Sequence, residues 1–311
     1  RVWPNGSDEI TGLAAHNGFL FIFGKRQILV YANATTPSTM TLSDTVEGIG
    51  CIARDSIQTT STDVLFLSNS GVRSLMRTIQ EKSAPERDLS KNIRNDLMGT
   101  VAGETLANIK SVYSERQAFY LLVTPSIDTT WCFDTKAFLP DGAARVTTWD
   151  SITPKSLLSK RDGSLLVGQN GYIGLYNTYQ DYNEAYRFLY YTNHADLGDQ
   201  NVTSILKKLS IVVIGGTNQD VTFKWGFDFK TNYLSDNASI PEQDVYYYGI
   251  AEYGANATTV AYYSDGVALQ TLNVSASGAG KVVQTGYEAD INGTALSIQK
   301  IEIQAKRGKL S

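Results

Sequence analysis

The sequence is poor in the residue types that most often bind metal ions or act as nucleophiles. Only two cysteines, Cys51 and Cys132, and two histidines, His16 and His194, occur among its 311 residues. They lie far apart along the chain, and none has the Cys or His spacing of a zinc site. We therefore expect no metal or other cofactor. Each cysteine lies in or beside an apolar run, which predicts a buried free thiol.

Motifs of the common enzyme classes are also missing. The sequence has no Gly-x-Ser-x-Gly elbow of a serine hydrolase and no calcium loop of the EF-hand type. Residues 277–282 have some likeness to a phosphate-binding loop, but they lack its first glycine and the Ser or Thr that follows its lysine. The acidic turns Asp141-Gly142 and Asp162-Gly163 fit ordinary hairpin chemistry, and the repeated Asp-box turn of sialidases is absent. The chain is not predicted to be an enzyme.

Long hydrophobic runs and a strong excess of one charge are absent too. No stretch approaches the ~20 apolar residues of a membrane span. The formal charge of −4 gives no overall electrostatic attraction to nucleic acid or to an anionic membrane. The chain begins at Arg1 with a strand signal near Ile10, so we expect it to be the C-terminal part of a longer product or one matured by cleavage.

Short apolar runs separated by turn residues predict an all-β chain. Asn17-Gly18 between two such runs is a strong hairpin signal, because both central residues of a type I′ turn need a positive φ. Four related units, each a capped strand, an apolar strand and a third strand, are found at residues 12–32, 56–77, 111–134 and 156–177. Their equivalent positions, roughly 45–55 residues apart, have the spacing of propeller blades; they are Leu13, Ile57, Val112 and Leu157.

These units predict a β-propeller-like domain over residues 1–199, incomplete at its N-terminus. An ordinary β-sandwich with hairpins of similar length is the alternative. A short helix is expected in the longest insertion, at residues 88–98, with Ser90 as its cap. The residues on or beside its apolar face form a candidate interface, either with another subunit or across a neighbouring repeat: Leu89, Ile93, Arg94 and Leu97.

The pattern changes after about residue 200, which predicts a β-sandwich domain over residues 200–311. In the strand expected over residues 221–230, the odd-numbered positions from Val221 to Phe229 share one apolar face. Further strands are expected over 245–253, 259–264, 267–274, 281–288 and 296–305. A phase slip at Gln299-Lys300 predicts a β-bulge in the last strand. The tyrosine-rich residues 182–191 are expected to form the connecting strand.

Aromatic residues leave a binding function open. Trp131, Trp149 and the run Tyr246-Tyr247-Tyr248 could stack on sugars if they are exposed, whereas the alternative places them in the core.

Several segments resemble one protein family in order and detail. Residues 48–51, followed by 56–60, 64–68 and 71–75, resemble a blade of the tail-hub or nozzle proteins of short-tailed bacteriophages, also called packaged-DNA stabilisation proteins. Residues 20–31 resemble the preceding blade, and Asp88-Leu89-Ser90 and residues 190–198 are also similar to that family. The resemblance covers about residues 10–199, with weaker support from 298–306. The chain departs from the family by lacking the expected N-terminal portion.

The resemblance implies a structural virion protein without an active site. Such a protein forms a ring, a hexamer by family analogy, below the portal and adaptor, where it retains packaged DNA and conducts it during ejection. The implied partners are other copies of the chain, adaptor and portal-side proteins, and tail spike, fibre or needle proteins. DNA would pass through the lumen without specific binding, and no membrane is involved. The implied location is the virion tail, after assembly in the bacterial host cytoplasm. The alternative function is a receptor- or glycan-binding module on a particle or cell surface.

Overall fold

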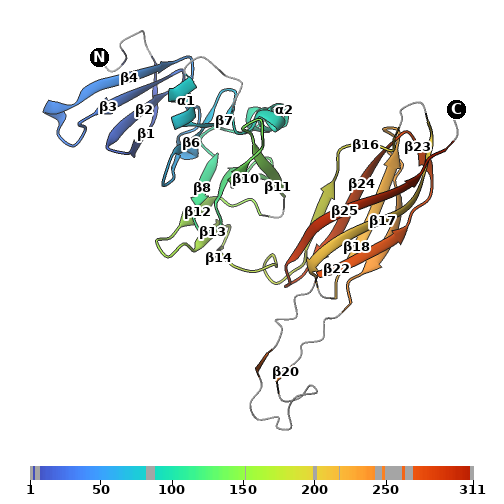
Figure 1. Ribbon diagram of the computed structural model, residues 1–311. Coiled ribbons are helices and arrows are strands. Elements are labelled where there is room, and N and C mark those ends of the chain that lie inside the picture. The colour runs from blue at the N-terminus through green and yellow to red at the C-terminus, as the bar shows by residue number, and fades with distance from the viewer. Residues whose placement is uncertain are drawn as a thin grey trace. The chain divides into compact units, whose positions relative to one another are not determined.

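The chain is all-β and divides into two compact units, Arg1–Asn177 and Thr178–Ser311 (Figure 1). The computed structural model describes residues 3, 8–81, 88–150, 152–198, 202–216, 218–241, 247–248, 261–262 and 269–308. No helix in these ranges is long and apolar enough to span a bilayer.

The described residues of the first unit form four antiparallel sheets, each made of strands that follow one another in the sequence. Sheet A contains β1 (Ile10–His16), β2 (Phe19–Gly24), β3 (Gln27–Ala32) and β4 (Thr41–Glu47). Sheet B contains β5 (Gln58–Thr59), β6 (Val64–Ser68) and β7 (Gly71–Ser74). Sheet C contains β8 (Lys110–Ser114), β9 (Phe119–Thr124), β10 (Thr129–Phe138) and β11 (Ala144–Trp149), and sheet D contains β12 (Ser156–Ser159), β13 (Leu165–Gln169) and β14 (Tyr172–Tyr176).

The four predicted units correspond to these four sheets. Leu13, Val112 and Leu157 lie in the first strands of sheets A, C and D, and Ile57 directly precedes the first strand of sheet B. At the first hairpin, φ is 49° at Asn17 and 79° at Gly18, which confirms the predicted turn. The sheets follow one another in an open succession, and the described residues do not close them into a ring.

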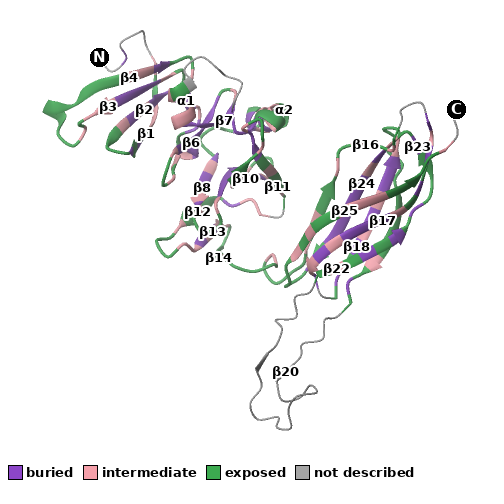
Figure 2. Cartoon of the chain, viewed as in Figure 1, coloured by how far each residue is buried: buried purple, intermediate pink, exposed green. Residues whose placement is uncertain are grey.

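Each sheet packs on the next through an apolar core. Phe23 of sheet A meets Phe66 of sheet B with ring centroids 5.1 Å apart. Tyr120 of sheet C packs with residues of sheet B, and Phe119, on the opposite face of sheet C, contacts Tyr176 of sheet D. The middle strands β6 (labelled in Figure 2) and β9 are buried along their whole length, because both faces of sheets B and C are covered.

The helical insertion differs in detail from the prediction. Between β7 and β8 the chain forms α1 (Leu75–Glu81), a 3₁₀ turn η3 (Lys91–Ile93) and α2 (Arg94–Ala102), so the α-helix begins later than residue 88. Shorter 3₁₀ turns are η1 (Pro37–Thr39) and η2 (Arg54–Ser56). Ser90 makes no side-chain capping bond; its hydroxyl is used elsewhere, as described below.

The second unit is a sandwich of two sheets around one core. Sheet E has the order β15 (Tyr186–Tyr191), β24 (Val282–Ile291), β18 (Asp220–Phe227) and β19 (Leu234–Ser239), with β16 (Ala195–Asp196) also paired to β24. In sheet F, β17 (Ser204–Gly215) pairs with β22 (Leu269–Ser275), β23 (Ala279–Gly280) and β25 (Leu296–Lys306). The two short strands β20 (Tyr247–Tyr248) and β21 (Ala261–Tyr262) pair with each other. The remainder of the strands expected at 245–253 and 259–264, and the start of the one expected at 267–274, lie outside the described residues.

The bulge predicted at Gln299-Lys300 is confirmed. Val212 pairs with Lys300 and Val213 with Ile298, so Gln299 has no partner opposite it. The prediction that Phe229 continues the core face of β18 is wrong, because Asp228 and Phe229 have φ values of 51° and 60° and end the strand. Phe229 is 72% exposed.

The boundary between the units lies earlier than the expected one at 199/200. The tyrosine-rich strand β15 pairs with β24 from Tyr186 to Tyr191, so it is part of the second unit rather than a connection to it.

Candidate functional site

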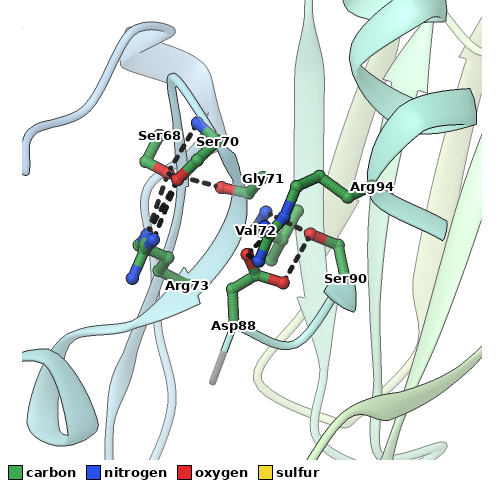
Figure 3. Close-up of polar contacts among 8 residues, drawn as sticks. All are labelled: Ser68, Ser70, Gly71, Val72, Arg73, Asp88, Ser90 and Arg94. Carbon is green, nitrogen blue, oxygen red and sulfur yellow. Dashed lines mark hydrogen bonds and ion pairs between the residues drawn. The ribbon is translucent and has the colours of Figure 1, made fainter. Parts of the chain in front are cut away.

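The helical insertion is attached to sheet B by a buried polar junction (Figure 3). The Leu89 backbone N–H donates to the Val72 carbonyl at 3.0 Å, and the Val72 N–H donates to Ser90 Oγ at 3.0 Å. The Leu89 carbonyl accepts a bond of 2.9 Å from Ala144 N–H of β11. Residues 88–90 therefore link β7 of sheet B to β11 of sheet C.

Asp88 connects this junction to α2. Its side chain is buried, and its Oδ2 lies 2.6 Å from Nη2 and 3.1 Å from Nε of Arg94, while its Oδ1 accepts from Ser90 Oγ at 3.2 Å. A buried carboxylate needs such compensation, because isolated charges are strongly disfavoured away from water. The ion pair thereby fixes the start of α2 on the junction.

Gly71 makes the close approach of Ser90 possible. Its φ is 133°, a region that favours glycine, and a Cβ at this position would overlap Ser90 Oγ. The hydroxyl occupies that space and satisfies the buried N–H of the next residue, Val72.

A buried arginine, Arg73, lies on the other side of β7. Arg73 is 4% exposed, and its Nε donates to Ser68 Oγ at 3.1 Å while its Nη2 donates to Ser70 Oγ at 2.8 Å (Figure 3). Burial lowers the pKa of Arg73 from its ordinary value, although nearby Asp88 acts in the opposite direction. Strand β7 therefore has buried polar side chains on both sides: Asp88 and Ser90 on one, and Arg73 on the other.

The four candidate interface residues have different environments. Leu89 and Leu97 are buried in the core shared by sheets B and C, with 1% and 0% of their surface exposed. Ile93 packs on the edge of that core and Arg94 pairs with Asp88, and both retain partial exposure. Two alternatives were considered for this face: a contact with another subunit, or packing across a neighbouring repeat. Packing across a neighbouring repeat accounts for the burial of Leu89 and Leu97.

The outer face of sheet E holds a different polar cluster. Glu288 accepts from Arg187 Nη2 and Lys224 Nζ, both at 2.6 Å, and from the Tyr191 hydroxyl. Burial alone would raise the pKa of Glu288, but the bonds from Lys224, Tyr191 and Arg187 outweigh it and lower the pKa to about 2. The carboxylate is therefore held charged.

Two tyrosines cover glycines beside this cluster. The Tyr191 ring fills the space that a Cβ on Gly286 would need, and a Cβ on Gly226 would lie 3.1 Å from the Tyr233 ring. The two rings meet edge to face with centroids 5.7 Å apart, and the Tyr233 hydroxyl donates to Gln284 Oε1. The exposed fractions are 37% for Tyr191 and 38% for Tyr233, so this face presents ordered aromatic rings to solvent.

The remaining sequence candidates are placed as follows. Cys51 and Cys132 are buried free thiols, as predicted, and burial raises the pKa of both, that of Cys132 to about 12. His16 is buried at the end of β1, and the His194 ring lies beside the Phe229 ring, tilted by 31° with the ring centroids 4.2 Å apart. Within the described ranges, no group of three or more His, Cys, Asp or Glu side chains could hold a metal ion.

Asp141 and Asp162 stabilise the turns in which they lie by accepting hydrogen bonds from backbone N–H groups. Their Oδ1 atoms accept from the N–H groups of Ala143 and Ser164 at 3.1 and 2.9 Å. These backbone bonds lower the pKa of Asp141, and bonds from Lys160 and Ser164 lower the pKa of Asp162. The predicted hairpin roles are confirmed.

Of the described aromatic candidates for sugar binding, Trp131 is buried in the core, and Trp149 is partly buried and packs against it. Trp131 is 6% exposed, and Trp149 is stacked on Tyr176 with ring centroids 5.8 Å apart. The side chains of Tyr246, Tyr247 and Tyr248 lie outside the described residues. Sequence reasoning missed Tyr191 and Tyr233; the available signal was a glycine inside each of two strands, Gly226 and Gly286.

Comparisons with known proteins give no family. No protein-family model matches the chain, and no curated protein matches it. One solved structure with some similarity is a tryptic core variant of Cry1Da from Bacillus thuringiensis, at 12% identity and a TM-score of 0.24. The match covers 96% of this chain and 52% of the Cry1Da chain, so this chain spans about half of that structure. A similarity at this level carries no argument about fold or function.

Gly71→Ala tests the junction between β7 and the helical insertion. We expect a loss of about 3 kcal/mol in unfolding free energy, because the positive φ is strained and Ser90 must leave the Val72 N–H unsatisfied. Gly99→Ala in α2 is the matched control: nothing lies within 4 Å of its new Cβ, so it should stabilise by about 0.5–1 kcal/mol. Urea unfolding of both variants measures the difference. Equal effects would contradict the described junction.

Glu288→Gln tests the cluster on sheet E through pH. The folded pKa of about 2 lies below the unfolded value near 4.5, so this group's contribution is present above pH 4.5 and is lost as the pH falls towards 2. The variant should therefore show a smaller loss of stability between pH 5 and pH 2 than the parent chain, in thermal melts across that window. Glu184→Gln, which removes an exposed carboxyl of the same unit outside the cluster, is the matched control for the loss of one negative charge.

Proposed function

We propose that the chain is a structural virion protein of a bacteriophage tail, part of the tube or nozzle ring below the portal and adaptor. The observation that carries the proposal is that the segments resembling tail-hub blades fold as consecutive sheets, each packed on the next. In this proposal the four sheets are blades of a propeller-like domain. Ring neighbours, adaptor and portal-side proteins, and a spike, fibre or needle protein are its partners.

The mechanical role follows from the packing. A ring around the exit channel must withstand the packaged genome and then let it pass without binding it specifically. Sheets buried on both faces give a stiff body, because a close-packed interior has low compressibility. The formal charge of −4 is compatible with a lumen along which DNA slides.

Quantitative mass spectrometry of purified particles from the source of this gene tests the proposal. We expect a fixed stoichiometry of about six copies per particle beside the portal and adaptor proteins, since closed rings have cyclic symmetry. Reporter peptides from both units, for example from β9 and β24, guard against counting a cleaved fragment. Absence of the chain from every particle would overturn the proposal.

Glycan binding is the second candidate function, and the aromatic face of sheet E is the observation that favours it. Tyr191 and Tyr233 present partly exposed rings, and Lys224, Arg187 and Gln284 surround them with groups that can bond to sugar hydroxyls. The network among these residues orders them before any ligand arrives, which reduces the entropy lost on binding.

A glycan array probed with the purified chain tests this candidate, with Tyr233→Ala as the diagnostic variant. If the face binds sugars, the variant should lose about tenfold or more in affinity, because stacking on the ring is removed. Phe229→Ala removes an exposed aromatic side chain of the same unit and should leave binding unchanged. Binding that is equal in all three proteins, or absent from the array, would reject sheet E as a sugar-binding face.

A further inference from the structure

Asn-Gly pairs occupy three turns that the structure describes. They share an asparagine amide followed by a glycine with a positive φ, and they are Asn17-Gly18, Asn170-Gly171 and Asn292-Gly293. The first two are the two-residue turns of the β1–β2 and β13–β14 hairpins, and the third begins the turn between β24 and β25. All three pairs are exposed, so access to water does not distinguish them. A fourth pair, Asn5-Gly6, lies outside the described residues.

Asparagine followed by glycine is the sequence most prone to deamidation, because glycine has no side chain to hinder the reaction. The glycine N–H loses its proton, its nitrogen forms a bond to Cγ of the asparagine, and the amide nitrogen leaves as ammonia. Water then opens the resulting succinimide ring at either carbonyl, which gives aspartate or isoaspartate. The peptide must rotate out of its turn conformation before the nitrogen can reach Cγ. Hydrogen bonds that hold the glycine N–H or the asparagine amide therefore slow the reaction.

Both reacting groups are held in the turn of the second unit. The Gly293 N–H donates to the Tyr179 carbonyl at 2.8 Å, and Asn292 Oδ1 accepts from Gln180 Nε2 at 2.7 Å. All four residues belong to the second unit, and both bonds must break before the Gly293 nitrogen can reach the Asn292 amide.

The two hairpin turns of the first unit have no such bonds. Neither the N–H groups of Gly18 and Gly171 nor the side chains of Asn17 and Asn170 bond to another residue in the part of the chain that the structure describes. A Cβ on Gly18 or on Gly171 would meet nothing within 4 Å. No described neighbour therefore opposes rotation of these two peptides.

We infer that Asn17 and Asn170 are sites of spontaneous deamidation, whereas Asn292 is protected while the second unit is folded. Each conversion adds one negative charge, so the formal charge changes from −4 to −6 when both sites have reacted. The inference is independent of the proposed function, because it depends only on contacts within each unit.

The two products differ in their effect on sheets A and D. Isoaspartate directs the backbone through the former side chain and adds a methylene group to a turn of two residues. The pairs His16–Phe19 and Gln169–Tyr172 depend on that turn length, so the extra atom disturbs the register of both hairpins. Aspartate keeps the backbone unchanged and tolerates the φ of 49° found at position 17.

Ageing of the purified full chain at mildly alkaline pH, followed by peptide mapping with mass spectrometry, tests the inference. Asn17 and Asn170 should convert about tenfold or more faster than Asn292, because two hydrogen bonds must first break at Asn292. Methylation by a protein isoaspartyl methyltransferase distinguishes isoaspartate from aspartate. In concentrated urea the three rates should become similar, because the chain is unfolded and each site is an Asn-Gly pair.

Two variants separate the parts of the argument. Gln180→Ala removes the bond to Asn292 Oδ1 and should accelerate conversion of Asn292 by about fivefold. The rates at Asn17 and Asn170 should stay unchanged in this variant and are its internal control. The double variant Asn17→Asp with Asn170→Asp reproduces the aspartate product, so aged chains that contain isoaspartate should melt at a lower temperature than this variant.

Two results would overturn the inference: Asn292 converting as fast as Asn17 in the folded chain, or Asn17 and Asn170 staying intact in the folded chain while the chain in urea converts. An unchanged Asn292 rate in Gln180→Ala would contradict the protection assigned to Gln180. Equal melting temperatures of the aged chain and the double variant would contradict the disturbed register.

Discussion

Burial of β6 and β9 on both faces is the constraint on which the first unit depends. A strand with apolar side chains on both sides requires a covering layer above and below. Sheets A and C provide those layers for β6, and sheets B and D provide them for β9. The unit is therefore a succession of packed sheets, because an inner sheet that covers its neighbour on one face must itself be covered on its other face.

Where one sheet packs on the next, some backbone N–H and C=O groups have no partner within their own sheet. Segments between the sheets provide hydrogen-bond partners for them. Val72 bonds through both its N–H and its carbonyl to residues 88–90, so the insertion completes the hydrogen bonding of β7. The absence of a side chain at Gly71 creates the space for Ser90, and the Asp88–Arg94 pair holds that segment against α2. The helical insertion thus has a structural role in joining sheets B and C.

Turn residues and the alternation of apolar and polar positions predicted much of this fold. They could not predict contacts between residues that lie far apart in the sequence. The hairpin at Asn17-Gly18, the four units and the bulge at Gln299 depend on neighbours in the sequence, and each is confirmed. The alternation of apolar and polar residues predicted that β18 continues to Phe229. This alternation gives no indication of the left-handed backbone conformation at Asp228, where the strand ends. Ser90 bonds to Val72, 18 residues away, and the partners of Glu288 lie 64 (Lys224), 97 (Tyr191) and 101 (Arg187) residues away, where periodicity gives no information.

The two units differ in how completely they bury their apolar faces. In the sandwich, both inner faces meet in one core, and the outer face of sheet E carries the Glu288 network and its tyrosines. In the first unit, single apolar side chains of the end sheets are exposed, among them Leu13 of sheet A and Ile173 of sheet D. The ordered polar surface with its aromatic rings therefore belongs to the second unit, and the succession of packed sheets belongs to the first. The two functions proposed for the chain would therefore draw on different units: the tail-ring proposal on the packed sheets of the first, and glycan binding on the outer face of sheet E in the second.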